Sequence, residues 1–447
     1  MNNVVSDLAT YILGGRLVVV DGRYGFGWSS GLFAFVSNLS ATLENLSSIF
    51  PGAHRLLSLR FVDCSKIKIS DGAFSSAKKL RLLDLRGCLD KDFLDNAYWP
   101  DSGTPPPTKQ PLKRCSMGKL PESIGQLKRL RYLNAPAIQD RVLPLSIING
   151  LSRSLRYLSL RGSRQLSELT EAFGSMEYLE YLDLSGCSGL KSLPKSFGAC
   201  WRSLLHLDLS GCTGLKALPQ SVRKVSSNSS KLRHLDLSGC SCLEGATEAL
   251  SGCTDLRYLN LSHRCGYSVE DWFHLKGLDD VLPTLKELQF LGISSCLDPF
   301  CYAMPAEESS KYVNCISMLD KLEHLDLSQN KFLRHLPEKI GALKELRTLD
   351  LSMCFRLESL QGIGEVNELR ALDISGCPQL NPLPEDTQQQ LAKLPFLESR
   401  EWLTSITGPS QASGSQDWAS TSQDAARQTR MYPSSSEPEI TEIPENH

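Results

Sequence analysis

A nine-residue motif recurs along this chain and constrains its fold more than any other feature of the sequence. The motif reads Leu-x-x-Leu-x-Leu-x-x-Cys, with Asn sometimes in the last place, and one clear copy is LEYLDLSGC from Leu179. Copies begin at Leu56, Leu80, Leu130, Leu155, Leu179, Leu204, Leu232, Leu256, Leu285, Leu322, Leu346 and Leu369. Because a single copy cannot bury its own apolar face, the copies must stack on one another to form a core.

The spacing within and between the copies predicts the local structure. Leucines at the fourth and sixth positions lie on the same face of a strand, whereas the third, fifth and seventh residues lie on the other face. Most copies stand 23 to 25 residues apart, which leaves room for one strand and a return segment. The return segments contain Leu-Pro, as in GLKSLPKSFG from Gly189, and proline fits neither a regular ladder nor a helix interior.

This combination is typical of a leucine-rich repeat, in which each unit consists of a short strand and a return path. The sequence therefore predicts an α/β-type solenoid. It is a leucine-rich-repeat horseshoe with a parallel β-sheet on the concave face and irregular or 3-10 return arms.

Three regions follow from where the repeats lie. Residues 1–52 precede the regular array, include a predicted strand from Leu17, and are expected to cap the first repeat. Residues 53–403 form the leucine-rich-repeat domain, with about 12 repeats and with insertions near 90–118 and 296–316. Residues 404–447 are rich in Ser, Gln, Pro and Glu with few aliphatic side chains, so we expect a disordered tail.

Charge and hydropathy exclude several functional classes. The 48 basic and 50 acidic residues give a net charge of −2, which argues against a nucleic-acid partner. No run of 18 apolar residues occurs, so no membrane span is predicted. The first 13 residues are too polar for a secretory signal, and we expect a cytoplasmic protein.

The cysteines follow the repeat and do not form a redox or metal motif. The chain has 15 cysteines, an odd number, and no Cys-x-x-Cys pair. Seven of them occupy the ninth position of the motif: Cys64, Cys88, Cys187, Cys212, Cys240, Cys354 and Cys377. Their spacing is thus explained by the repeat, so neither a disulfide framework nor a metal site is predicted. The sequence also lacks HExxH and P-loop motifs, and we interpret the glycine-rich stretch GFGWSSG from Gly25 as a turn. We therefore predict no catalytic residues, no cofactor and no enzymatic activity.

Two positions of the motif supply the candidate binding residues of the concave face. The third carries aromatic and imidazole rings, and the fifth carries mostly aspartate. The candidates for protein binding are Tyr132, Tyr157, Tyr181, His206, His234, Tyr258, His324, Asp183, Asp208 and Asp236. Rings could supply rigid contact area for a protein partner or could hold adjacent strands together by stacking. For the aspartates, a structural role as a regular part of the repeat is the preferred interpretation.

The motif followed by Leu-x-x-Leu-Pro-x-Ser-Ile-Gly resembles the repeat domain of plant nucleotide-binding leucine-rich-repeat disease-resistance proteins, especially those of cereals. The resemblance covers roughly Ala53 to Leu403. The opening MNNVVSDLATYILGG also resembles the end of that family's nucleotide-binding module, with Met1, Asn2 and Asn3 on its Met-His-Asp. The family's His and Asp are both Asn here, and no P-loop precedes them. The resemblance therefore implies a recognition module lacking the nucleotide-binding module.

Two functional hypotheses follow. The resemblance implies a role in plant defence, in which the repeats recognise a pathogen effector, a host protein or a co-receptor. The alternative is an intracellular leucine-rich-repeat scaffold or ubiquitin-ligase substrate adaptor, since Cys-type repeats also occur in F-box proteins. The stretch CSKIKISDGAF at Cys64 favours the adaptor slightly, but no F-box precedes the repeats.

Overall fold

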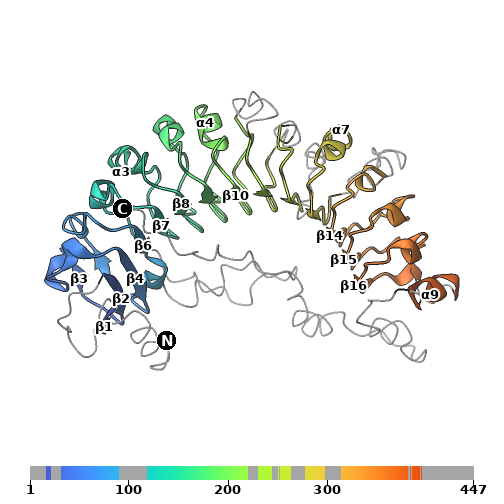
Figure 1. The fold of residues 1–447 in the computed structure, drawn as a ribbon, viewed down its shortest axis with the longest axis horizontal. Helices are drawn as coiled ribbons and strands as arrows, with labels where there is room; N and C mark the ends of the chain where they lie inside the picture. The colour runs from blue at the N-terminus through green and yellow to red at the C-terminus, as the bar shows by residue number, and fades with distance from the viewer. Residues whose placement is uncertain are drawn as a thin grey trace, which may run out of the picture.

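The chain forms a curved solenoid with its strands on the inner side (Figure 1). The computed structural model describes residues 17–21, 32–89, 118–219, 230–243, 250, 252–262, 277–296, 314–380 and, with gaps, 383–394. The tail predicted from residue 404 lies outside the described residues, as do the start of the chain and most of the two predicted insertions.

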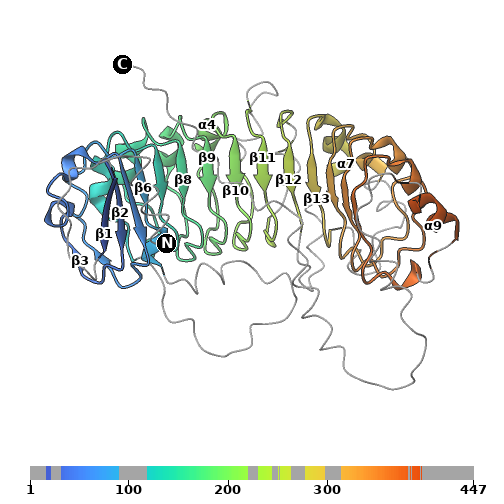
Figure 2. The same cartoon turned by 60° about the horizontal axis from the view of Figure 1, so that its bottom comes forward.

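One parallel sheet runs the length of the solenoid. It has 14 strands in the order β1-β2-β4-β6 and then β7 to β16 in sequence. The strands are β1 (Leu17–Asp21), β2 (Phe33–Ser37), β4 (Ser58–Val62), β6 (Leu82–Asp84), β7 (Tyr132–Asn134), β8 (Tyr157–Ser159), β9 (Tyr181–Asp183), β10 (His206–Asp208), β11 (His234–Asp236), β12 (Tyr258–Asn260), β13 (Phe290–Gly292), β14 (His324–Asp326), β15 (Thr348–Asp350) and β16 (Ala371–Asp373). Figure 2 shows these strands side by side. The predicted horseshoe with a parallel concave sheet is confirmed.

The sheet begins before the first recognisable copy of the motif. The strand predicted from Leu17 is present as β1, which pairs in parallel with β2, and β2 pairs in parallel with β4. A separate two-stranded sheet joins β3 (Thr42–Leu43) to β5 (Lys68–Ile69). The residues ahead of Leu56 therefore add two strands to the same sheet.

One predicted repeat start is wrong. We placed a copy at Leu285, but Phe290 pairs with Tyr258 and with His324, which puts Phe290 at the third position and Leu288 at the first. Leu285, Leu288 and Leu291 are spaced by three residues. A motif that starts at Leu285 and one that starts at Leu288 therefore both place leucine at the first and fourth positions. The strand takes the phase in which Ile293 and Cys296 occupy the sixth and ninth positions, and both side chains pack with the core.

Within the described residues, the return arms carry only short helices, as predicted. They lie on the outer side of the curve (Figure 1), because the strands line the inner side. The helices are η2 (Leu46–Ser48), η3 (Ala53–Arg55), η4 (Arg86–Cys88), η5 (Glu122–Gln126), α3 (Leu145–Leu151), η6 (Glu171–Ser175), α4 (Phe197–Trp201), α7 (Leu278–Val281), η8 (Leu282–Thr284), η9 (Ile340–Ala342), η10 (Ile363–Glu365), η11 (Pro378–Leu380) and α9 (Glu385–Ala392).

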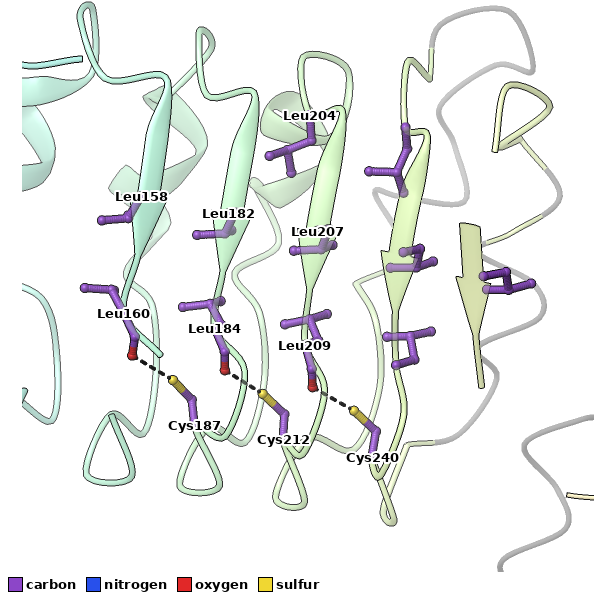
Figure 3. Close-up of a cluster of buried hydrophobic side chains, with 14 of the residues drawn as sticks. Leu158, Leu160, Leu182, Leu184, Cys187, Leu204, Leu207, Leu209, Cys212 and Cys240 are labelled. Carbon is purple, nitrogen blue, oxygen red and sulfur yellow. Dashed lines mark hydrogen bonds between the residues drawn. The ribbon is translucent and has the colours of Figure 1, made fainter. Parts of the chain in front are cut away.

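The motif leucines fill the space between the sheet and the return arms. Leu204, Leu207 and Leu209 hold the first, fourth and sixth positions around β10, and each is fully buried. The corresponding leucines of neighbouring repeats stand beside them in rows (Figure 3). One continuous apolar core runs from Ala34 to Leu394, so each repeat depends on its neighbours for burial.

The ninth-position residues connect successive coils by hydrogen bonds. Six of the seven predicted ninth-position cysteines, all except Cys88, donate the thiol to the carbonyl oxygen of the residue at or equivalent to the sixth position one repeat earlier. Three such bonds, drawn in Figure 3, join Cys187 to Leu160 (3.4 Å), Cys212 to Leu184 (3.2 Å) and Cys240 to Leu209 (3.1 Å). Asn330 takes the same place in its repeat and donates Nδ2 to the carbonyls of Ile293 (3.1 Å) and Leu327 (2.8 Å). Both residue types thus add hydrogen bonds between successive repeats. The carbonyls of Leu160, Leu184 and Leu209 also accept a backbone N–H from three residues later, so each thiol supplies a second donor.

Candidate protein-binding surface

The third-position side chains form one continuous stack of rings along the concave face. Register places these residues side by side, because each is the Cα partner of the next. Ring centroids are 4.1 Å apart for Tyr132–Tyr157, 4.2 Å for Tyr157–Tyr181, 4.1 Å for Tyr181–His206, 3.8 Å for His206–His234, 3.9 Å for His234–Tyr258 and 4.2 Å for Tyr258–Phe290. The planes in these pairs are within 13° of parallel. We call these seven residues the ring stack.

The ring stack ends near the C-terminal repeats. His324 is predicted as a member, but its ring lies 6.5 Å from that of Phe290 and is tilted by 40°. Its Nδ1 instead forms a 2.6 Å hydrogen bond with Oγ1 of Thr348, the third-position residue of β15. His324 is therefore beside the stack without continuing it.

Phe290 is the ring that the sequence analysis missed. It was assigned to the wrong position because the repeat was started at Leu285. The stretch LQFLGISSC from Leu288 fits every conserved place of the motif, with Ile293 at the sixth and Cys296 at the ninth. If the repeat start had been chosen to match the ninth position as well as the leucines, the sequence would have placed Phe290 at the third position.

The ring stack is half-buried and uncharged. Each ring packs between its two neighbours but keeps part of its surface in contact with solvent. Burial lowers the pKa of His206 to about 2, with a further contribution from His234. Burial also lowers the pKa of His234 to about 4. Both imidazoles are thus neutral near pH 7, and burial raises the pKa of Tyr157, Tyr181 and Tyr258 so that their phenols stay protonated.

The fifth-position carboxylates form a second row parallel to the ring stack. Each accepts a hydrogen bond from the backbone N–H two residues later, where the chain leaves the strand. These bonds join Ser185 N to Asp183 (2.9 Å), Ser210 N to Asp208 (2.8 Å), Ser238 N to Asp236 (2.8 Å), Ser328 N to Asp326 (2.9 Å), Ser352 N to Asp350 (2.8 Å) and Ser375 N to Asp373 (2.8 Å). Local bonds of this kind stabilise a turn, which gives the aspartates the structural role preferred from the sequence.

The stacked carboxylates also disfavour one another's ionisation. Desolvation is the largest cause that raises the pKa of Asp208, and the charges of Asp236 and Asp183 add to it. Desolvation likewise raises the pKa of Asp236. The pKa of Asp350 is raised to about 7 by burial and then by Asp326. Asp183 is itself buried and also accepts from the hydroxyls of Ser159 (2.8 Å) and Ser185 (2.6 Å).

All predicted candidates except His324, which lies on β14, thus come together as two adjacent rows on strands β7 to β12. The ring stack offers a long, rigid surface of apolar faces with polar edges, whereas Asp183, Asp208 and Asp236 are committed to the backbone turns. Among the described residues, no group of three or more His, Cys, Asp or Glu is arranged to hold a metal ion. No helix within the described part of the chain is long and apolar enough to cross a membrane.

Comparison with known proteins supports the repeat assignment. Residues 178–200 and 321–343 match the family model for the Leucine Rich Repeat, and each segment contains one complete copy of the motif. No curated protein matches the chain. The chain thus carries leucine-rich repeats, a type of domain that generally serves for protein interaction.

The chain is similar in fold to a solved structure at low sequence identity. The crystal structure of the TLR13–ssRNA13 complex has a TM-score of 0.50 and 20% identity, over 81% of this chain and 46% of that chain. The functional domain of InlJ from Listeria monocytogenes, described as including a cysteine ladder, has a TM-score of 0.45 and 15% identity over 78% of this chain and 58% of that chain. The chain therefore spans about half the length of these two proteins.

Proposed function

We propose that this chain is a non-enzymatic protein-recognition module that binds its partner on the concave face. The observation that carries the proposal is the ring stack, an unbroken row of seven half-exposed rings on strands β7 to β13. Tyrosine is enriched in the centres of protein interfaces because it adds a large contact area at little entropic cost. A row of stacked rings is rigid before binding, which reduces the ordering cost of association.

The finer proposal is a role in plant defence, with the chain in the cytoplasm. Its support is the resemblance of the repeats and of the opening segment to cereal disease-resistance proteins. In that setting the partner is a pathogen effector, a host protein or a co-receptor. No cofactor enters the proposal, because recognition by shape and charge requires none.

The test compares the partners captured by a variant of the ring stack with those captured by a control variant altered outside the stack. The variant Tyr157→Ala/Tyr181→Ala/Tyr258→Ala truncates three rings of the stack. The control is Tyr178→Ala, which truncates an exposed tyrosine outside the stack (52% exposed). Partners captured from plant extract are identified by mass spectrometry, and circular dichroism checks that each variant remains folded.

A partner that binds the unmodified chain and the control but not the triple variant supports the proposal. Equal capture by the folded triple variant would place the binding site elsewhere. Recovery of a ubiquitin-ligase core subunit with the chain would favour the adaptor alternative over the defence role.

A further inference from the structure

The second position of the motif carries arginine on three consecutive repeats, which is the longest such run. Shorter runs of two follow at Arg233 and Arg257 and at Arg347 and Arg370. Arg81, Arg131 and Arg156 directly precede β6, β7 and β8. Backbone hydrogen bonds join them in a row, from Arg131 N to Arg81 O (2.8 Å) and from Arg156 N to Arg131 O (2.9 Å). Neighbouring members thus stand one strand spacing apart, about 4.8 Å. Among the described residues, neither Arg81 nor Arg131 forms an ion pair, and Arg131 is exposed.

The fifth and seventh positions of the same strands reinforce this positive charge. β7 and β8 carry Asn134 and Ser159 at the fifth position, where most later strands carry aspartate. Arg86 and Arg161 hold the seventh position on two of the three strands, where β9 to β11 carry serine. Across β6 to β8, five arginines therefore face a single carboxylate.

That carboxylate, Asp84, is not available to a partner. It is buried, and Arg86 binds it through Nη2 at 2.9 Å. Asp84 also accepts the backbone N–H of Arg86 at 3.1 Å. Arg156 pairs with Glu180, so Arg81 and Arg131, which form no ion pair among the described residues, carry the uncompensated positive charge of β6 to β8. We call this part of the face the basic section.

On the next three strands, acidic residues outnumber arginines at the second and fifth positions. Glu180, Asp183, Asp208 and Asp236 occupy the second and fifth positions of β9 to β11, against one arginine, Arg233. Even where burial reduces the charge of the aspartates, this part of the face has no excess of positive groups. Arg156 pairs with Glu180 at the boundary between the two sections. The concave face is therefore electrostatically polarised along the solenoid.

We propose that the basic section binds an acidic segment of the protein partner. This inference rests on the proposed function and names the chemistry of the partner at one end of the same face. The row from Arg81 to Arg156 spans two strand spacings, about 10 Å, which about three residues of an extended chain can cover. The rings of Tyr132 and Tyr157 directly follow Arg131 and Arg156 and offer apolar contact beside the charges.

The size of the basic section favours a peptide over a nucleic acid. A phosphate backbone gains affinity by contacting many cationic groups along its length. Here a longer polyanion would run from the basic section onto β9 to β11, where the second position carries a single arginine, Arg233. A short acidic segment matches the length of the arginine row instead.

The experiment measures binding of a fluorescein-labelled peptide of ten glutamates to the full chain by fluorescence anisotropy at low salt. The variant Arg81→Gln/Arg131→Gln/Arg156→Gln removes the arginine row. The matched control, Arg233→Gln/Arg257→Gln/Arg370→Gln, removes three second-position arginines elsewhere and changes the net charge equally. We expect the first variant to bind about tenfold more weakly or worse, and the control to bind like the unmodified chain.

Three results would overturn the inference. They are no binding of the peptide to the unmodified chain, equal weakening in both variants, and tighter arginine-dependent binding of an oligouridylate of the same length than of the peptide. These results leave the proposed function standing if the Tyr157→Ala/Tyr181→Ala/Tyr258→Ala variant still loses its captured partner. Conversely, if the ring variant retains that partner, the proposed function is contradicted whether or not the glutamate peptide binds.

Discussion

At the scale of single residues, each place in the motif has one dominant physical role. The leucines exclude water, the ninth residue donates to a buried carbonyl, and the fifth residue accepts from the turn that follows. The second and third places keep side-chain surface in most repeats, and the fifth and seventh places keep part of theirs in some repeats. The identity of residues at the second and third places therefore contributes most to what the concave face can bind.

The burial of the fourth-position leucine is tested by Leu207→Ala. Leu207 is fully buried between neighbouring coils, and truncation leaves a cavity that the stacked repeats cannot readily fill. We expect a loss of about 2–5 kcal/mol in the free energy of unfolding, measured by urea titration. Leu145→Ala is the control, because Leu145 is 54% exposed and its truncation should cost little. A loss for Leu207→Ala no larger than that of the control would refute its place in the core.

The burial of a fifth-position carboxylate, with the added repulsion of its neighbour Asp326, is tested by Asp350→Asn. The folded pKa of Asp350 is about 7, above the unfolded value of about 3.9. The folded state therefore holds this proton more tightly, and the associated stability is complete below about pH 4 and is lost as pH rises through 7. An amide at this place keeps the turn bond, as Asn260 does with Ser262 N (3.0 Å).

Asp350→Asn should therefore be more stable than the unmodified chain at about pH 8, by about 1–2 kcal/mol after allowance for solvent screening. The difference should vanish near pH 4, and the control Asp320→Asn, at an exposed site, should show no such trend. Thermal unfolding across this pH range measures both. A variant less stable than the unmodified chain at pH 8 would contradict the assignment.

At the scale of the repeat unit, the sequence predicted most of what the structure shows. The strands, their parallel order, the short helices of the return arms and six of the seven stacked rings follow from the spacing of the leucines and of the rings. The exception around Phe290 arose because three leucines spaced by three fit two phases. The strands β1 and β2 were harder to place in the sheet, because their sequences, LVVVD and FAFVS respectively, lack the motif.

The polarity of the concave face could not be read from the repeats one at a time. It depends on which residues stand beside one another across strands, as Arg81 and Arg131 do despite 50 residues of separation. A long insertion lies between those two repeats. Only the register of β6 against β7 shows that their arginines are neighbours.

The turn after each strand is tested at the eighth position of the motif. Gly186 has φ +68°, a left-handed conformation that five glycines adopt at this place: Gly162, Gly186, Gly211, Gly239 and Gly376. Met353 adopts the same conformation with φ +62°, which costs a residue with a Cβ about 1–2 kcal/mol. Met353→Gly should therefore stabilise the chain by about 0.5–1 kcal/mol, and Gly186→Ala should destabilise it by about 1 kcal/mol.

Urea titration of the two variants measures both changes. The pair serves as its own control, because the substitutions are made in opposite directions at equivalent places in two repeats. Changes of the same sign would show that the turns of these repeats are not equivalent.

At the scale of the whole molecule, the regular stacking of the repeats provides both the buried core and the surface proposed for recognition. Each repeat contributes one strand, so equivalent residues of successive repeats stand in rows. The third-position rings therefore form the ring stack, and the second-position arginines of β6 to β8 form the arginine row. The strands that carry these rows line the inner side of the curve (Figure 1), where a partner can contact several repeats at once. The proposed recognition of an acidic segment depends on this arrangement rather than on any single residue.

The register between neighbouring repeats is the claim on which the ring stack and the basic section both depend. Ser210 and Ser238 hold the seventh position of adjacent repeats, and Gly211 N donates to Ser238 O at 2.7 Å. Replacing both serines by cysteine and treating the chain with a short bis-maleimide should link residues 210 and 238, detected by mass spectrometry of the linked peptide. The pair Ser210→Cys/Ser375→Cys, whose sites follow strands six places apart in the sheet, should give no such link. Linkage of the distant pair at a comparable yield, with none between residues 210 and 238, would contradict the stacked parallel register.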